Sequence, residues 1–182
     1  MKKLLRYLLM TVMTVCFSLS CLSAEAATVA LLPLINNVQG DDIANQTFYK
    51  EAIATMNGQK GFLMVENDKL TAAIEAVNAG ENVPNEVAAA KIAKDGNVDI
   101  VIAMQLDKIE DETLFSSNES KIRVIIKGKV VSYNRLTGAY RVSKINEETL
   151  TPEVFSSRWD LPHEEWGKVV RKEIKRALTA KK

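Results

Sequence analysis

The chain has 182 residues, of which 47% are hydrophobic and 26% charged, and its formal net charge is +1. These values are typical of one globular domain and argue against an intrinsically disordered protein. A nearly neutral chain also lacks the strong positive charge that nucleic-acid binders usually carry, so we expect no nucleic-acid partner.

The first 26 residues differ from the rest of the chain. Basic residues near the start are followed by an uncharged segment, 7–24, and by the small-residue pattern Ala24-Glu25-Ala26. This order is typical of a secretory signal peptide. The apolar centre, 8–22, is shorter than the ~20 residues that span a bilayer. We therefore predict a signal peptide over residues 1–26 and a single α/β domain over residues 27–182.

Both cysteines, Cys16 and Cys21, lie inside this leading segment. Cleavage after Ala26 would leave a chain without disulfides, thiolate metal sites or cysteine nucleophiles. The protein would then be periplasmic or extracellular. The alternative is a lipoprotein anchored through Cys21, although Ser18 stands where the usual lipid-attachment motif has leucine.

An apolar run over residues 28–35 predicts a buried strand that ends near Pro33, because proline lacks an amide donor. A polar loop, 36–40, follows it. A helix then begins at Asp41 or Asp42, either of which can cap it, and runs to about Asn57. The segment 61–66 predicts a second, short strand.

Two further helices are expected next. The first is capped by Asn67 or Asp68 and closed by Gly80, and the second is capped by Asn85 and ends at Gly96.

Three strands follow, over residues 98–109, 121–135 and 140–147. The middle strand alternates apolar side chains with Arg123, Lys127 and Lys129, which predicts one face in the core and one in water. A turn at Thr137-Gly138 makes a hairpin with the third strand.

The segment 148–161 is expected to be irregular. A last helix opens at Pro162 and His163 and runs to about Ala180. The order β-α-β-α-α-β-β-β-α favours an α/β (α+β) fold with a mixed sheet and helices packed on it.

Three segments of the chain resemble a group of bacterial envelope proteins: 27–34 (ATVALLPL), 61–70 (GFLMVENDKL) and 90–102 (AKIAKDGNVDIVI). The group comprises the amino-terminal domain of TolB, the curli-secretion protein CsgG, and the outer-membrane lipoproteins that activate penicillin-binding proteins. The resemblance implies an anticodon-binding-like α/β domain that acts outside the cytoplasm as a docking module, and several members of the group are not enzymes. The chain departs from the group in lacking a clear lipid-attachment motif and a β-propeller extension.

The candidate chemical groups are few. His163 is the only histidine, and no serine stands in a nucleophile motif, so we expect an exposed helix-start residue rather than a catalytic base. With no cysteine left after cleavage, we expect no metal site of the usual His/Cys type. No phosphate-binding motif is present, so no cofactor is predicted.

An acidic stretch is expected to be a solvated loop between two strands, because it lacks the glycine turn of a calcium site. A pair of its carboxylates could still form a glycosidase-like site. The stretch contains Asp107, Glu110, Asp111, Glu112 and Glu119.

The two tryptophans have different expected roles. Trp166 lies on the apolar stripe of the last helix and is expected in the core, whereas Trp159 lies in the irregular segment and is the candidate partner contact. The basic face of that helix leaves peripheral membrane association open.

These observations favour a non-catalytic docking module of the bacterial cell envelope with a protein partner. Two alternatives stay open: a cell-wall hydrolase with an unrecognised carboxylate site, and a subunit of a homo-oligomeric envelope assembly.

Overall fold

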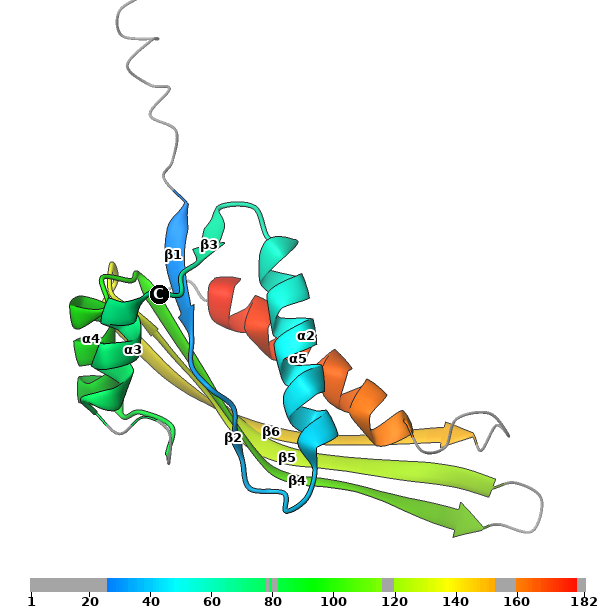
Figure 1. Cartoon of the computed structure of the whole chain (residues 1–182). Coiled ribbons are helices and arrows are strands. Elements are labelled where there is room, and N and C mark those ends of the chain that lie inside the picture. The colour runs from blue at the N-terminus through cyan, green and yellow to red at the C-terminus, as the bar shows by residue number, and fades with distance from the viewer. Residues whose placement is uncertain (1–25, 78, 80–81, 116–119, 153–159, 180–182) are drawn as a thin grey trace, which may run out of the picture.

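The computed structural model describes residues 26–77, 79, 82–115, 120–152 and 160–179. Within these ranges, four helices pack on one mixed sheet whose strands follow the order β3-β1-β4-β5-β6, with β2 beside β4 (Figure 1). The expected fold class is therefore confirmed. The elements are β1 (Ala27–Leu31), β2 (Ile35–Asn36), α2 (Asp42–Asn57), β3 (Phe62–Met64), α3 (Asp68–Glu75), α4 (Glu86–Asp95), β4 (Ile100–Phe115), β5 (Ser120–Asn134), β6 (Ala139–Pro152) and α5 (Leu161–Thr179).

The first apolar run forms two strands instead of one. β1 pairs in parallel with β3 and β4, and pairing with β4 resumes at β2 after an interruption around Pro33. Proline has no amide hydrogen to donate, so the ladder breaks there. The expectation of a single strand over 28–35 and of a loop beginning at Asn36 was wrong in this detail.

The first three described helices, α2, α3 and α4, begin at the residues that the sequence predicts. The side chains of Asp41, Asn67 and Asn85 each accept a hydrogen bond from the backbone amide three residues later, at 2.9–3.0 Å. Each cap satisfies one of the free amides at a helix start.

The late strands are longer than expected. β4 continues to Phe115 and β6 to Pro152, and both pair with β5 along almost its whole length. The acidic stretch up to Glu112 is therefore part of a strand, so the expectation of a loop was wrong, whereas its described acidic residues are exposed to solvent as expected. Residues 148–152, expected to be irregular, are also a strand. Cross-strand backbone hydrogen bonds compensate for the weak apolar pattern of these segments.

A β-bulge divides β4 between Leu106 and Lys108, where Asp107 is the extra residue. Gly128 lies opposite Leu106, and a Cβ atom at Gly128 would come within 2.2 Å of the backbone oxygen of Gln105. Only glycine allows this close approach. Beyond the bulge, pairing of β4 with β5 continues to Phe115.

Two apolar clusters lie on opposite faces of the sheet. The larger one, beneath α2 and α5, contains Phe48 and Trp166, both fully buried. The smaller one, beneath α3 and α4, includes Val101 and Ala103 of β4 and Val131 of β5. Among its described residues, this smaller cluster includes none of β4 after Ala103. The part of that face that lies beyond Ala103 of β4 is therefore not covered by an apolar cluster.

No helix in the described part of the chain is both long and apolar enough to cross a membrane.

Candidate functional site

His163 does not behave as the exposed residue that the sequence predicts. Its side chain is only 19% exposed, and its Nε2 atom lies 2.9 Å from Oδ1 of Asp41. The same Asp41 carboxylate caps α2, so the pair joins the start of α5 to the start of α2. Among the described residues, no hydroxyl group contacts the histidine, and the arrangement is a structural joint rather than a Ser-His-Asp triad.

The described acidic residues do not converge on one point. Glu110 pairs with Lys108 at 2.6 Å, and Glu112 pairs with Arg123 of β5. Successive side chains of a strand point to opposite faces, so Asp111 faces away from both glutamates. Glu119 lies outside the described residues. The carboxylate-site alternative therefore gains no support from this stretch. In the described ranges, no group of three His, Cys, Asp or Glu residues could hold a metal ion.

The two tryptophans can be compared only in part. Trp166 is fully buried, and its indole Nε1 donates to the backbone oxygen of Ala44 at 3.1 Å, as expected for a core residue. Trp159 lies outside the described residues, so its role as a partner contact stays a prediction.

A small cavity lies between α5 and the strands β5 and β6. It is lined by polar residues that include Ser132, Ser143 and Glu173, and its volume is about 70 Å³. That space accommodates a few water molecules but is well below the ~300 Å³ of a typical small-molecule site.

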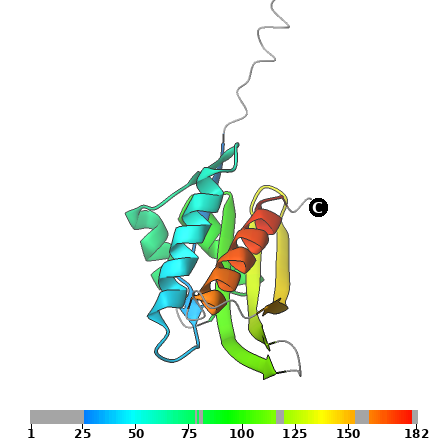
Figure 2. The same ribbon diagram turned by 90° about the vertical axis from the view of Figure 1, so that its right-hand side faces the viewer.

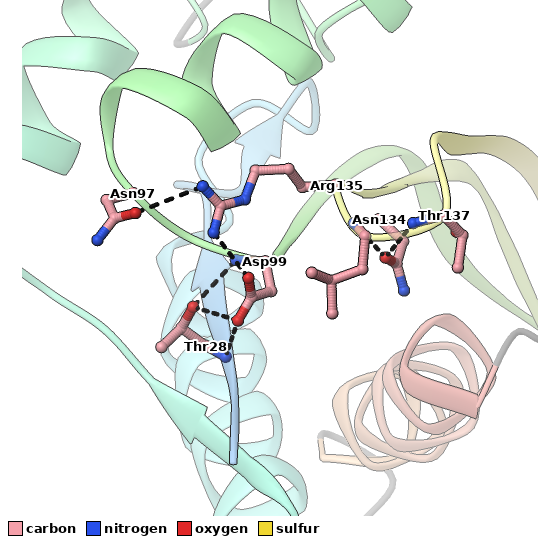
Figure 3. A network of polar contacts seen from close by, with 7 residues as sticks. Thr28, Asn97, Asp99, Asn134, Arg135 and Thr137 are labelled. Atoms are coloured by element: carbon pink, nitrogen blue, oxygen red, sulfur yellow. Dashed lines mark hydrogen bonds and ion pairs between the residues drawn. The ribbon is translucent and has the colours of Figure 1, made fainter. Parts of the chain in front are cut away.

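A polar network lies at the end of the sheet where β4 begins and where β5 turns into β6 (Figure 3). The Asp99 carboxylate accepts hydrogen bonds from the backbone amide and the hydroxyl of Thr28, at 3.0 and 2.8 Å, and from Nη2 of Arg135 at 2.8 Å. The hydrogen bond from Arg135, together with those from Thr28, lowers the pKa of Asp99. The network ties β1, β4 and the β5–β6 turn together, so its role is structural.

A different cluster lies on the sheet face opposite α2 and α5, just beyond the apolar cluster under α3 and α4. Lys129 of β5 stands directly opposite Lys144 of β6, and in the next row Lys127 stands opposite Lys108 of β4. Cβ atoms of directly opposed residues are ~5 Å apart. We call these four residues the lysine patch.

The lysine patch brings four positive charges together, and only one of them has an ion-pair partner in the described part of the chain. Lys108 pairs with Glu110, but Lys127, Lys129 and Lys144 form no ion pair with any described residue. Like charges placed directly across a sheet are destabilising. Two such rows side by side therefore mark this face as a candidate binding surface for a negatively charged group.

The sequence alone identifies only half of this patch. Alternation along the middle strand predicts that Lys127 and Lys129 lie on the solvent-facing side of the sheet, where Lys127 is exposed and Lys129 is half-buried. Lys108 and Lys144 join them only through the register of the two neighbouring strands. The sequence shows that the strand 98–109 ends in polar residues and that the strand 140–147 contains a lysine. It does not show which residues of the middle strand lie opposite Lys108 and Lys144, so neither lysine could be assigned to the patch.

Comparisons with known proteins give a fold and no family. No protein-family model and no curated protein matches the chain. Its fold is similar to that of the hypothetical protein CT253 from Chlamydia trachomatis, with a TM-score of 0.50, 14% identity, and 85% of this chain and 99% of that chain covered.

Two further solved structures are similar at lower scores. Lipoprotein GNA1162 from Neisseria meningitidis has a TM-score of 0.45 and 12% identity, with 82% of this chain and 99% of that chain covered. The LpoB C-terminal domain from Escherichia coli has a TM-score of 0.38 and 13% identity, with 68% and 84% covered. The similarity to CT253 supports the fold and assigns no activity. The specific likeness to TolB and CsgG stays a prediction.

Proposed function

We propose that this protein is an exported, non-catalytic docking module of the bacterial cell envelope that binds an acidic surface of a partner protein through its lysine patch. The observation that carries the proposal is the pair of like-charge rows, Lys108–Lys127 and Lys129–Lys144, on a sheet face beyond the helices α3 and α4. Such rows lower stability, and a bound carboxylate-rich surface would offset that cost.

The surroundings of the patch favour a protein partner over an anionic membrane. Beyond the lysines, the same face carries Glu110 and Glu148 on either side of Ile125. Glu110 pairs with Lys108, and Glu148 lies 3.6 Å from Arg123, so this part of the face carries both signs of charge. A uniformly negative lipid surface does not complement such a mixture. A protein surface can instead present acidic groups to the lysines and basic or apolar groups to the row beyond.

The decisive experiment compares two charge-reversed variants of equal charge. Lys127→Glu/Lys129→Glu removes the centre of the patch, whereas Lys91→Glu/Lys94→Glu makes the same change on the exposed face of α4. Crosslinking in intact cells should capture one defined partner with the wild type and with the α4 variant, and lose it with the patch variant. Retention of that partner by the patch variant would refute the assignment of the surface.

Salt provides a second test of the same surface. Exposed charges are screened over ~8 Å at physiological ionic strength. Binding of the purified partner should therefore weaken as salt rises from 50 to 500 mM, and the patch variant should show little of this dependence. Binding of wild-type protein to vesicles rich in anionic lipid, without any protein partner, would favour the membrane alternative.

Export is part of the proposal. β1 begins at Ala27, whose backbone amide donates to Gly61 at 2.9 Å, so cleavage after Ala26 would leave every described strand intact. Mass measurement of the protein from the periplasm should give a chain that starts at Ala27. A Cys21→Ser variant should be processed normally. Loss of processing in this variant, with lipid found on the wild-type chain, would establish the lipoprotein alternative.

A further inference from the structure

β6 is the outermost strand of the sheet and has 14 residues (Figure 2). The opposite edge strand, β3, has only three. One side of β6 pairs with β5, and no other described strand pairs with its outer side. A long strand of this kind presents a row of backbone donors and acceptors to any further strand.

The side chains of β6 have a sign pattern that an antiparallel copy would complement. On the face that carries the lysine patch, the order along the strand is Val142, Lys144, Asn146, Glu148 and Leu150. The first and last of these are apolar and 55–56% exposed. The order is apolar, positive, neutral, negative, apolar. A second copy of β6 that runs antiparallel to the first therefore places a negative side chain opposite each positive one.

We propose that two copies of this protein pair through β6, antiparallel, with Asn146 opposite Asn146 on the two-fold axis. In this register Val142 of each copy lies opposite Leu150 of the other, and Lys144 lies opposite Glu148. Each contact occurs twice by symmetry. Both exposed apolar side chains of the strand are covered, and the two sheets become one.

The neighbouring registers are worse, which makes the proposed one specific. A two-fold axis at Lys144 sets lysine against lysine, and an axis at residue 147 sets glutamate against glutamate. An axis at residue 145 places Val142 opposite Glu148. Only the axis at Asn146 matches the apolar pair and the charged pair at once, and like charges directly opposed are unfavourable.

The basic side chains of α5 near this edge do not oppose the pairing strongly, because they have partners in their own chain. Lys172 Nζ lies 2.6 Å from Glu147 Oε1, and Lys168 Nζ lies 2.5 Å from Glu165 Oε1. The two α5 helices would lie on the same side of the joined sheet, with these ion pairs between them.

A single cysteine on the axis tests the register directly. Opposed residues in antiparallel strands have Cα atoms ~4.5 or ~5.5 Å apart, and both distances allow a disulfide. The variant Asn146→Cys, in a chain whose Cys16 and Cys21 have been removed by processing or replaced by serine, should form a covalent dimer under mild oxidation. Lys127→Cys, which is exposed on the same face one strand inward, should not. Equal crosslinking of the two variants would refute the register.

A charge-swap cycle tests the interface without new covalent bonds. Sedimentation of the wild type over a concentration series should show dimerisation. Lys144→Glu and Glu148→Lys should each weaken it by about tenfold or more, and the double variant should recover most of the loss. A wild type that remains monomeric at millimolar concentration, or a double variant as weak as the single ones, would overturn the proposal. Lys127→Glu, which changes a patch charge that is not directly opposite Lys144, should leave dimerisation intact, so failure of the docking surface and failure of the dimer can be told apart.

Discussion

The two halves of the sheet are constructed differently. The proximal half, residues 100–104, 130–134 and 139–143, has helices on both faces and contributes to both apolar clusters. The distal half, residues 105–115, 120–129 and 144–152, contributes only to the cluster beneath α2 and α5, and its other face carries the lysine patch and the row Glu112–Arg123–Leu150. The difference teaches that the same three strands can be covered by apolar clusters on both faces at one end and leave one face without such a cluster at the other.

The largest expected effect contrasts one isoleucine from each half. Ile102 is fully buried in the proximal half, whereas Ile125 is half-buried on the patch-bearing face of the distal half. Ile102→Ala should lower the free energy of unfolding by about 3–4 kcal/mol, because it removes buried methyl groups and leaves a cavity. Ile125→Ala should cost less than about 1 kcal/mol. Urea titration of both variants measures the contrast, and equal losses would show that the two halves are not distinct.

The next effect lies at the boundary between the halves. Gly128→Ala should lower the free energy of unfolding by about 2–3 kcal/mol, because the new Cβ would lie 2.2 Å from a backbone oxygen and the bulge in β4 would have to shift. Gly138→Ala is a useful companion, since its glycine has a φ of +66° but no atom within 4 Å of the added Cβ. It should cost only about 1 kcal/mol of backbone strain. A thermal-unfolding series that ranks the two variants in the reverse order would contradict the clash.

A smaller, pH-dependent effect is expected at the proximal end. The folded pKa of Asp99 is lowered, so its contribution is present above the ordinary aspartate range near ~4 and is lost as the pH falls through the folded value. Because the Arg135 side chain is 36% exposed, solvent screens the pair, and Asp99→Asn should cost about 1 kcal/mol at pH 7. The gap between wild type and variant should narrow below pH 4. A gap that stays constant from pH 7 to pH 3 would rule out the charge as its cause.

The smallest effect has the opposite sign. Lys129→Gln removes one of two directly opposed charges in the lysine patch, so it should raise the free energy of unfolding by about 0.3–0.5 kcal/mol. Lys91→Gln, on the exposed face of α4, should leave it nearly unchanged. The comparison should be made at low salt, where the repulsion is greatest. Destabilisation by Lys129→Gln would mean that the lysine has a supporting role in the fold.

The order of the elements could be read from the sequence because its signals are local. Asp41, Asn67 and Asn85 each cap a helix by a hydrogen bond that spans three residues, and the apolar residues 100–104 within the expected strand 98–109 mark a buried strand. The full length of β4 and β6 could not be read in this way. Their distal residues are charged or polar, and it is pairing with β5 that holds them as strands.

The candidate sites also combine features that local sequence patterns predict with features that only the pairing of distant segments creates. The alternation of Lys127 and Lys129 predicts a solvent-facing row, but Lys108 and Lys144 complete the patch only through strand register. His163 has its partner, Asp41, 122 residues away in the chain, so nothing near it in the sequence indicates that pair.

The sequence by itself determined the succession of helices and strands and the starts of the first three described helices, because each depends on residues a few positions apart. It also predicts the export signal from a pattern of the same local kind. The tertiary structure alone decided where the acidic stretch lies, what His163 contacts, and which lysines stand together. Those features depend on cross-strand pairing and helix packing, which join residues that are distant in the chain. No local pattern of side chains specifies such contacts.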